Sequence, residues 1–506
     1  MKHSLLLSCA FSCMFAWSSF GQSFDGYALY NLQNQNTTYL IDKDQNIAHS
    51  WSCAVACNYT VLLKPNGNIV RGGKYSGNQL TGAAIGGMVQ EIDPSGTVVW
   101  EYIYSNANHC SHHDITLLDN GNVILTAWEV KTAAECTQAG VQSPNSNGQW
   151  PTHFIELEPD GIGGASIIWE WHMFDHFVQD YDSSKDNYGV VSAHPELMDV
   201  NLLSVGGGGG GGGGYDWFHV NGVDYNAVLD QLVFSSRFLS EVIVIDHSTT
   251  SAEAASHSGG NSGMGGDFLY RWGKPSNYGS AGAQTIAAAA HDPRWITDDG
   301  RPNGGMIQFF NNKGGSGNSS VIDAISAPES GFIYTMTGNS YGPSNYDWRH
   351  ECLASSTGQS SHNRMSNGNT FVNVSNEYMY EVDANDNLIW QYNAGPTKAF
   401  RYECGDAGII ALLGVDPCNL LSLSEETLGG IQFYPNPSKT GVFTIDGVNV
   451  LDQDVLITVV DIYGNVVFEM NNAQEIDLSA MTSGVYFATL NFGGKRTVTK
   501  KLSLVR

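Results

Sequence analysis

Four histidines stand just before apolar segments and are the residues of this sequence best suited to chemistry. They are His113, His219, His291 and His362, which precede ITLLDNGNVIL, VNGVDYNAVLDQLVF, DPRWITDDGRPNGGMIQFF and NRMSNGNTFVNV. An imidazole titrates near neutral pH, and its neutral form acts as a nucleophile, a proton acceptor or a metal ligand. Because the four recur at the same phase of similar segments, we expect them to meet at one site.

The segments that must position these histidines follow a repeated pattern. An apolar run, an Asx-Gly turn, a second apolar run and a strand ending in Trp recur, as in TVLLKPNGNIV and MVQEIDPSGTVVWEY. Such alternation, broken at Asn-Gly or Asp-x-Gly, is typical of β-hairpins. Units of about 40–60 residues with four short strands indicate a β-propeller. The innermost strands of a propeller line a central channel, so residues at one end converge, although a phase error of one residue would turn a side chain away.

The predicted fold is all-β, a six-bladed β-propeller followed by a small C-terminal β-sandwich. Five units fill residues 60–392, and a sixth forms from Tyr27–Leu32 and Thr38–Trp51, joined by Ala399–Leu413. Joining both ends of the ring in one blade protects sheet edges. Seven blades remain an alternative. We place the propeller domain at residues 22–415.

Composition agrees with this fold and excludes one class of partner. The chain has 506 residues, a formal charge of −27 and only 14% charged residues, which disfavours binding to nucleic acid. Its 58 glycines suit tight turns. Gly206–Gly214 and Ser251–Gly266 are expected to be loops because of their small-residue content.

The N-terminus predicts export. Lys2 precedes an apolar run from Leu5 to Phe20, and we interpret residues 1–21 as a secretory signal peptide. The run is short for a membrane span, and we predict no transmembrane segment. A lipoprotein signal ending at Cys9 is the alternative.

The remaining cysteines fit an oxidising compartment. Their neighbours in sequence suggest the pairs Cys53–Cys57, Cys110–Cys136 and Cys352–Cys404, with Cys418 left over. Zinc binding by Cys53 and Cys57 competes with this interpretation, but no second Cys/His pair stands at metal spacing.

The chain changes character after Cys418. A predicted linker covers residues 416–430, and residues 431–506 carry YPNP, DIYGN, IDLS, SGVY and a KKL end. Alone, this pattern predicts a small β-sandwich. It closely resembles the C-terminal type A sorting domain of the type IX secretion system. The resemblance implies contact with that machinery and delivery through the periplasm to the cell surface or the medium.

Residues 216–248 read DWFHVNGVDYNAVLDQLVFSSRFLSEVIVIDHS. They resemble the aryl-sulfate sulfotransferase family, whose members carry DW-x-H-x-N followed by a strand ending in S-x-R. The resemblance covers about residues 60–395 and extends to WEWHMFDHFVQDYD, His291-Asp292 with Trp295, Phe310-Asn311-Asn312 and the segment from Asn367 to Trp390.

The resemblance implies transfer of a sulfuryl group from a phenolic sulfate ester to a phenol, through a sulfohistidine and without a nucleotide donor. The three charged oxygens need fixed donors in the transition state, which His219, His291 and Arg237 can supply. One histidine attacks sulfur and another accepts the phenol proton; His362 is our candidate nucleophile. The candidate substrate-binding residues are His113, Asn221, Asn312 and Trp295. We expect no cofactor and no metal.

One departure from the family keeps other functions open. Family members have an arginine soon after the Phe-Asn/Asp-Asn segment, where this chain has Lys313, and lysine lacks the planar fork of arginine. The alternative function is therefore a non-catalytic propeller that binds a ligand or glycan. A His-rich metalloenzyme is a third hypothesis. His172 and His176 could chelate a metal only on a helix, and the WEW context argues against one.

Overall fold

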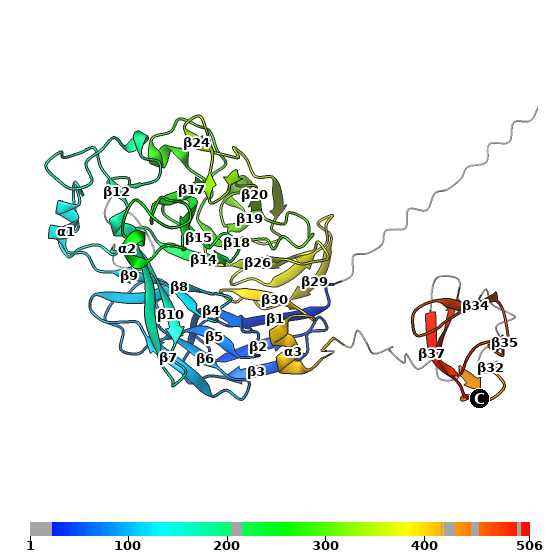
Figure 1. The fold of residues 1–506 in the computed structure, drawn as a ribbon. Helices are drawn as coiled ribbons and strands as arrows, with labels where there is room; N and C mark the ends of the chain where they lie inside the picture. The colour runs from blue at the N-terminus through cyan, green and yellow to red at the C-terminus, as the bar shows by residue number, and fades with distance from the viewer. Residues whose placement is uncertain (1–22, 204–214, 416, 419–430, 447–454, 493–496) are drawn as a thin grey trace, which may run out of the picture. The chain divides into compact units, whose positions relative to one another are not determined.

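The computed structural model describes residues 23–203, 215–415, 417–418, 431–446, 455–492 and 497–506 (Figure 1). The chain divides into two compact units, Met1–Val415 and Asp416–Arg506. Strands dominate both units, which confirms the predicted all-β class. The predicted signal peptide, the nine-glycine segment and most of the predicted linker lie outside the described residues. Within the described ranges, no helix has the length and apolar character needed to cross a membrane.

Six four-stranded antiparallel sheets are found among the described residues of the first unit. In five of them the strands lie side by side in chain order. The first two are β4 (Cys57–Leu63), β5 (Ile69–Lys74), β6 (Gly87–Ile92) and β7 (Val98–Ile103), then β8 (His109–Leu117), β9 (Val123–Glu129), β10 (Thr152–Pro159) and β11 (Ala165–His172). The next three are β14 (Val220–Asn226), β15 (Gln231–Ser236), β16 (Glu241–Asp246) and β17 (Phe268–Trp272), then β18 (Ala290–Trp295), β19 (Ile307–Asn311), β20 (Val321–Ile325) and β25 (Trp348–Glu351), and then β26 (Ser361–Arg364), β27 (Thr370–Asn373), β28 (Met379–Val382) and β29 (Leu388–Tyr392). The sixth has the order β30 (Ala399–Glu403), β1 (Gly26–Asn31), β2 (Thr37–Ile41) and β3 (Ile47–Ser52).

Smaller elements lie in the connecting segments. They are the helices α1 (Ala133–Gln138), α2 (Ser251–Ala254) and α3 (Ala407–Leu413), and the strand pairs β12 (Phe177–Val178) with β13 (Met198–Asp199), β21 (Glu329–Ser330) with β22 (Ile333–Tyr334), and β23 (Met336–Thr337) with β24 (Ser340–Tyr341).

The six sheets close into a ring. The first strand of each sheet contacts the first strand of the next, in the cyclic order β4, β8, β14, β18, β26, β30 and back to β4. Antiparallel pairing of β30 with β1 joins the two ends of the unit, with Gly26 opposite Glu403 and Tyr30 opposite Ala399. Figure 1 shows β30 beside β1. The sequence predicted that Ala399–Leu413 joins the N-terminal strands. The pairing is confirmed for Ala399–Glu403, whereas Ala407–Leu413 forms the helix α3, which Asp406 caps through its side chain.

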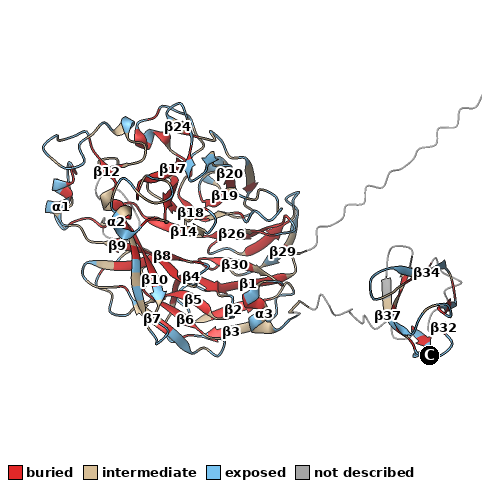
Figure 2. Cartoon of the chain, in the orientation of Figure 1, coloured by how far each residue is buried: buried red, intermediate tan, exposed pale blue. Residues whose placement is uncertain are grey.

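Burial changes across two of the sheets from the innermost to the outermost strand. Every residue of β4 is buried, whereas β7 and β3 are mostly exposed or half-buried (Figure 2). The sheet of β14 differs, because its outermost strand β17 is buried throughout. The predicted hairpin turns form where glycine accepts a positive φ, 85° at Gly67 and 92° at Gly121. The Trp residues that end several outer strands are buried, and Trp390 donates from its indole to the carbonyl of Lys43 at 2.7 Å. Neighbouring sheets are therefore packed face to face around the ring.

A buried ion network lies where the innermost strands meet. Just before β30, Lys398 places its Nζ 2.6 Å from Asp114 Oδ2 on β8 and 3.0 Å from Asp292 Oδ1 on β18. Arg294 Nε lies 3.1 Å from the same oxygen of Asp292. Burial alone would raise the pKa of Asp292, but these cations hold it well below its ordinary value.

The other innermost strands bind the same two carboxylates. The hydroxyl of Thr60 on β4 donates to Asp114 Oδ1 at 2.5 Å, and the N–H of Val223 on β14 donates to Asp114 Oδ2 at 3.0 Å. The N–H of His362 on β26 donates to Asp292 Oδ2 at 3.1 Å. Each sheet of the ring thus contributes at least one group to a single network.

Removing the shared cation should destabilise the whole ring. Lys398→Met leaves two buried carboxylates short of a partner, and we expect a loss of about 3–5 kcal/mol in the free energy of unfolding. Lys43→Met is the matched control, because Lys43 and Asp25 form an exposed ion pair at 2.9 Å whose loss should cost less than about 1 kcal/mol. Thermal unfolding of both variants measures the difference. Equal melting temperatures would contradict the importance of the network.

The cysteine pairs predicted from the sequence are wrong. Cys53, Cys57, Cys110, Cys136 and Cys352 are free thiols, whereas Cys404 and Cys418 are disulfide-bonded. Closeness in sequence does not bring two Cβ atoms to bonding distance. The Cys110 thiol faces Asn78 at 3.5 Å, and the Cys136 thiol faces the carbonyl of Lys131 at 3.9 Å.

The segment Ser251–Gly266 is not entirely a loop, as its composition had suggested. It begins with α2, because Thr250 and Glu253 form a capping box in which each side chain accepts the other's backbone N–H. The composition hid this signal, since Ser and Ala are compatible with either state.

The described residues of the second unit form two sheets. One has the order β31 (Gln432–Tyr434), β32 (Val442–Asp446), β35 (Glu475–Asp477), and the other β34 (Val466–Asn471), β33 (Val455–Val460), β36 (Gly484–Phe492), β37 (Thr497–Leu504). One apolar cluster draws on both sheets, including Phe443 and Ile476 from the first and Ile457 and Leu490 from the second.

Candidate active site

Three of the four histidines singled out in the sequence come together at one end of the innermost strands. The rings of His113 and His219 lie 4.8 Å apart in an edge-to-face arrangement. His291 is close enough for its charge to interact with both. β-Bulges interrupt β8, β14 and β18 at or beside these positions, and His113 and His219 have φ of 50°. Bulges re-aim side chains near active sites, and these bulges lie beside the three rings.

His291 is held in one tautomer. Its Nδ1 lies 2.8 Å from the carbonyl oxygen of Ala289 and 2.8 Å from Asn312 Oδ1, and both of these atoms only accept hydrogen bonds. The Asn312 amide is itself oriented, because its Nδ2 donates to the carbonyl of Ser356 at 3.0 Å. Nδ1 must therefore carry the hydrogen, which leaves a lone pair on Nε2. Burial, together with the nearby Arg237, lowers the pKa of His291 to about 3, so the ring is neutral at pH 7.

Arg237 borders the same space as His291 Nε2. Its N–H donates to the carbonyl of His219 at 3.1 Å, and its Nη1 donates to the carbonyl of Thr357 at 2.6 Å. A Cβ atom on Gly358 would lie 2.9 Å from Arg237 Nη1 and 3.7 Å from His291 Nε2. The absence of a side chain at Gly358 therefore lets its backbone lie close to both the cation of Arg237 and the free lone pair of His291 Nε2.

His219 is paired with an acid. Its Nδ1 lies 2.6 Å from Asp216 Oδ2, and its backbone N–H donates to Asp216 Oδ1 at 3.1 Å. Burial would raise the pKa of Asp216, but His219 brings it below its ordinary value. An ionised Asp216 places the hydrogen on Nδ1 and leaves Nε2 of His219 able to accept a proton. Phe238 stacks on the His219 ring at 4.8 Å.

The edge of the site contains further polar and aromatic groups. His113 Nδ1 lies 2.7 Å from His112 Nδ1, and burial lowers the pKa of His113 well below its ordinary value. Tyr59 lies edge-on to His113 at 5.4 Å and accepts a hydrogen bond from Gln359. Burial raises the pKa of Tyr59 to about 12, so it stays a phenol at neutral pH.

His362 does not share this environment. Gln308 Nε2 donates to its Nδ1 at 2.7 Å, and its Nε2 donates to the carbonyl of Asp292 at 2.9 Å. Burial lowers the pKa of His362 to about 4, so the ring is neutral and both nitrogens are occupied. This arrangement gives His362 no lone pair for attack and places it in the ion-network layer.

The other predicted residues separate into two groups. Asn221 donates to the carbonyl of Ala290 at 3.0 Å and accepts from Ser235 at 2.6 Å, so it ties β14 to the strand that carries His291. Trp295 lies four residues beyond His291 on β18, and its N–H donates to Asp224 Oδ2 at 3.1 Å. The Lys313 side chain is exposed. Asn221 and Asn312 thus hold the backbone and the ring of the site in place through hydrogen bonds. Over the described residues, the hydrogen bonds and ring contacts of Trp295 and Lys313 do not involve the three clustered histidines.

Residues that the sequence did not single out complete the site. Asp216 stands in the DWFHVN segment, and its spacing of three residues from His219 was an available signal. Tyr59, Gly358 and Gln359 carry no comparable signal, because they belong to segments far apart in the chain.

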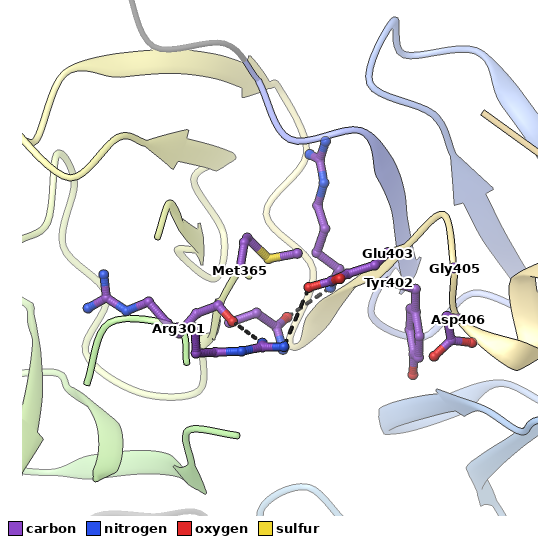
Figure 3. Close-up of a pocket in the computed structure, with 9 residues that line it drawn as sticks. Arg301, Met365, Tyr402, Glu403, Gly405 and Asp406 are labelled. Carbon is purple, nitrogen blue, oxygen red and sulfur yellow. Dashed lines mark hydrogen bonds and ion pairs between the residues drawn. The ribbon is translucent and has the colours of Figure 1, made fainter. Parts of the chain in front are cut away.

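A separate pocket of about 380 Å³ lies between β26, β30 and the segment around Arg301 (Figure 3). Arg301 Nη2 lies 2.6 Å from Asp299 and 3.6 Å from Glu403, and its Nη1 donates to the carbonyl of Arg364 at 2.7 Å. Its guanidinium group is therefore fully engaged with neighbouring groups.

Comparison with known families identifies the chain. The family described as Arylsulfotransferase (ASST) matches residues 25–334, more than half of the sequence, and the chain belongs to this family. The family described as Secretion system C-terminal sorting domain matches residues 432–505. This domain indicates type IX secretion to the cell surface or beyond, as predicted. No curated protein matches the chain.

Solved structures show only distant similarity. BamB from Moraxella catarrhalis is 10% identical, with 74% of this chain and 76% of that chain covered and a TM-score of 0.31. A 6-phosphogluconolactonase-like protein from Bacteroides fragilis is 11% identical, with 75% and 98% covered and a TM-score of 0.37. Apo AztD from Citrobacter koseri is 8% identical, with 75% and 99% covered and a TM-score of 0.35.

The buried neutral histidines predict acid sensitivity. Burial lowers the pKa of six of them: His112, His113, His153, His291, His350 and His362. Below pH 6.5 the unfolded chain binds protons at these positions and the folded chain does not. The free energy of unfolding therefore decreases as the pH is lowered, by up to about 1.4 kcal/mol per pH unit for each histidine. His172 and His247, whose pKa is raised to about 9, are charged in the folded state throughout this range, and in the unfolded state they become charged as the pH falls below 6.5, so their contribution levels off toward pH 5.

We therefore expect the melting temperature to fall steadily from pH 7 to pH 5, and His362→Gln to make that fall shallower. Differential scanning calorimetry at constant ionic strength measures both effects. A melting temperature that is constant or rises toward pH 5 would contradict the neutral assignment.

Proposed function

We propose that this protein is an exported arylsulfotransferase that moves a sulfuryl group from a phenolic sulfate ester to a phenol, through a sulfated His291 and without a nucleotide donor. We further propose that the ring of six sheets is a six-bladed β-propeller and that the two C-terminal sheets form a β-sandwich recognised by the type IX machinery. The first proposal rests mainly on one observation, the forced tautomer of His291 beside Arg237. Family membership supports it independently.

In the first half-reaction, His291 Nε2 attacks the sulfur of the donor. A bond forms between Nε2 and sulfur, the bond between sulfur and the phenolic oxygen breaks, and the phenolate leaves with the electron pair. The ring becomes positively charged, and Ala289 O and Asn312 Oδ1 stabilise that charge at the Nδ1 hydrogen. Arg237 faces the sulfuryl oxygens, whose charge must be balanced in the transition state.

In the second half-reaction, the acceptor phenol attacks the same sulfur. The bond between sulfur and Nε2 breaks, and the neutral imidazole of His291 is restored. His219 Nε2 accepts the phenol proton, and the paired Asp216 stabilises the imidazolium that forms. Tyr59 and Phe238 offer aromatic faces for the phenyl rings of the two substrates.

Turnover of 4-nitrophenyl sulfate tests this proposal. With phenol present and no nucleotide, we expect release of 4-nitrophenol and formation of phenyl sulfate. His291→Ala should reduce kcat by at least about 10³-fold, and His219→Ala by about 10²–10⁴-fold. His362→Gln is the matched control, since a glutamine can accept from Gln308 and donate to the carbonyl of Asp292, and it should cost less than about 10-fold.

Three results would count against the proposal. Release that does not depend on phenol would indicate a sulfatase. No release by the folded protein with several aryl sulfates would favour a binding propeller that keeps only the scaffold. A large loss in His362→Gln with normal turnover in His291→Ala would move the nucleophile to His362.

A further inference from the structure

A second cluster of ionisable side chains lies apart from the residues of the candidate active site. His176 Nδ1 and His257 Nδ1 each lie 2.8 Å from the same oxygen, Asp267 Oδ1. His176 and Asp267 are buried, and the His257 side chain is 61% exposed. The three residues come from two separate segments, one ending the short helical turn Met173–Asp175 and the other following α2.

A neutral His176 ring has one N–H, which is too few to donate to both of its hydrogen-bond acceptors. Its Nε2 donates to the carbonyl of Ala254 at 2.8 Å, so in the neutral ring Nδ1 is a lone pair that faces a carboxylate oxygen. Two acceptors at 2.8 Å repel each other unless a cation lies between them. Over the described residues, the ion pairs of Asp267 are with these two histidines only. A metal ion or an additional proton is needed to satisfy the cluster.

Several contacts orient His176 as a metal ligand. A carbonyl acceptor on the nitrogen opposite the metal fixes the tautomer of metal-binding histidines in general. The His176 ring also stacks on Trp171 at 5.4 Å with an interplanar angle of 4°, and Trp171 Nε1 donates to the carbonyl of Gly266 at 2.7 Å. A Cβ atom on Gly266 would lie 2.6 Å from His176 Nε2. The glycine is therefore required for this close packing.

We propose that His176, His257 and Asp267 bind a divalent transition metal ion, of which Zn²⁺ is the best fit. The three ligand atoms lie within 4.8 Å of one another, and a tetrahedral zinc ion spaces its ligands about 3.4 Å apart. Two imidazoles and one carboxylate suit Zn²⁺, whereas Ca²⁺ and Mg²⁺ prefer oxygen ligands alone. The sequence had led us to expect no metal, because His176 was paired there with His172 rather than with His257.

A pocket of about 520 Å³ adjoins the cluster. His257 and Asp267 line it together with His194 and Glu196, whose side chains lie 2.8 Å apart. A water molecule or an anionic ligand can complete the coordination from this pocket. Phe177, the residue after His176, packs on Trp217 at 5.3 Å, and Trp217 is the residue after Asp216.

The metal content of the protein tests this proposal, and the test does not depend on sulfuryl-transfer activity. The full exported chain is stripped with EDTA, reloaded with ZnCl₂, passed through gel filtration and analysed by mass spectrometry for zinc. We expect one zinc ion per chain in the wild type. His257→Ala and Asp267→Asn should weaken zinc binding by more than about 100-fold. Because His257 is exposed, its removal should leave the fold intact.

His49→Ala is the matched control, since His49 is a partly exposed histidine outside the cluster and should leave the zinc content unchanged. Co²⁺ loading adds a spectroscopic test, with visible absorption typical of a tetrahedral site in the wild type and not in His257→Ala. Absence of retained zinc in the wild type would overturn the proposal. Equal zinc content in all three variants would also overturn it.

Discussion

The contact of Lys398 with Asp114 and Asp292 is the interaction on which the rest of the structure depends. A buried ammonium group shared by two carboxylates is stable only if both stay in place, because either carboxylate alone would be an uncompensated charge in the interior. The network therefore fixes the relative positions of β8, β18 and β30. Hydrogen bonds to Thr60, Val223 and His362 extend this constraint to the other three innermost strands.

The active site follows directly from this constraint. His113 precedes Asp114, and His291 precedes Asp292, so two of the three clustered histidines stand directly before an anchored carboxylate. Fixing the carboxylates fixes the neighbouring backbone, including the φ of 50° at His113 and at Asp292. Such positions are costly for residues other than glycine and persist where the surroundings enforce them. The ion network thus helps to hold the backbone that places His291 Nε2 near Arg237.

The electrostatics of the site contrast with those of the whole chain. The protein has a formal charge of −27, yet the proposed substrate is an anion. Attraction must therefore be local, and Arg237 beside His291 provides it. The neutral state of His291 has a related cause, since burial and the nearby arginine both disfavour a proton on the ring. A neutral nucleophile beside a fixed cation suits attack on a sulfate ester.

Repetition in the sequence made much of the fold predictable. Asx-Gly turns and alternating strands indicated the sheets, and the leftover segments at both ends indicated the pairing of β1 with β30. The last strand of one sheet, β25, was not predicted, because the hairpins β21–β24 separate it from β20. Residue type and phase located His113, His219 and His291.

The position of His362 within its repeat is the same as that of these three histidines, so the sequence could not distinguish it from them. What distinguishes it is its hydrogen bonds to Gln308 and to the carbonyl of Asp292. Tyr59 and Gly358 could not be predicted either, because their roles depend on the spatial positions of distant segments. The cysteine pairs failed for the same reason.

The most direct test of the proposed mechanism is to trap the sulfated enzyme. The protein is mixed with excess 4-nitrophenyl sulfate without an acceptor, quenched under alkaline conditions and digested for peptide mass mapping. We predict one sulfuryl group on the peptide that contains His291, removed when phenol is added before the quench. A sulfuryl group on another histidine, or turnover with no covalent label at all, would contradict the central role of His291.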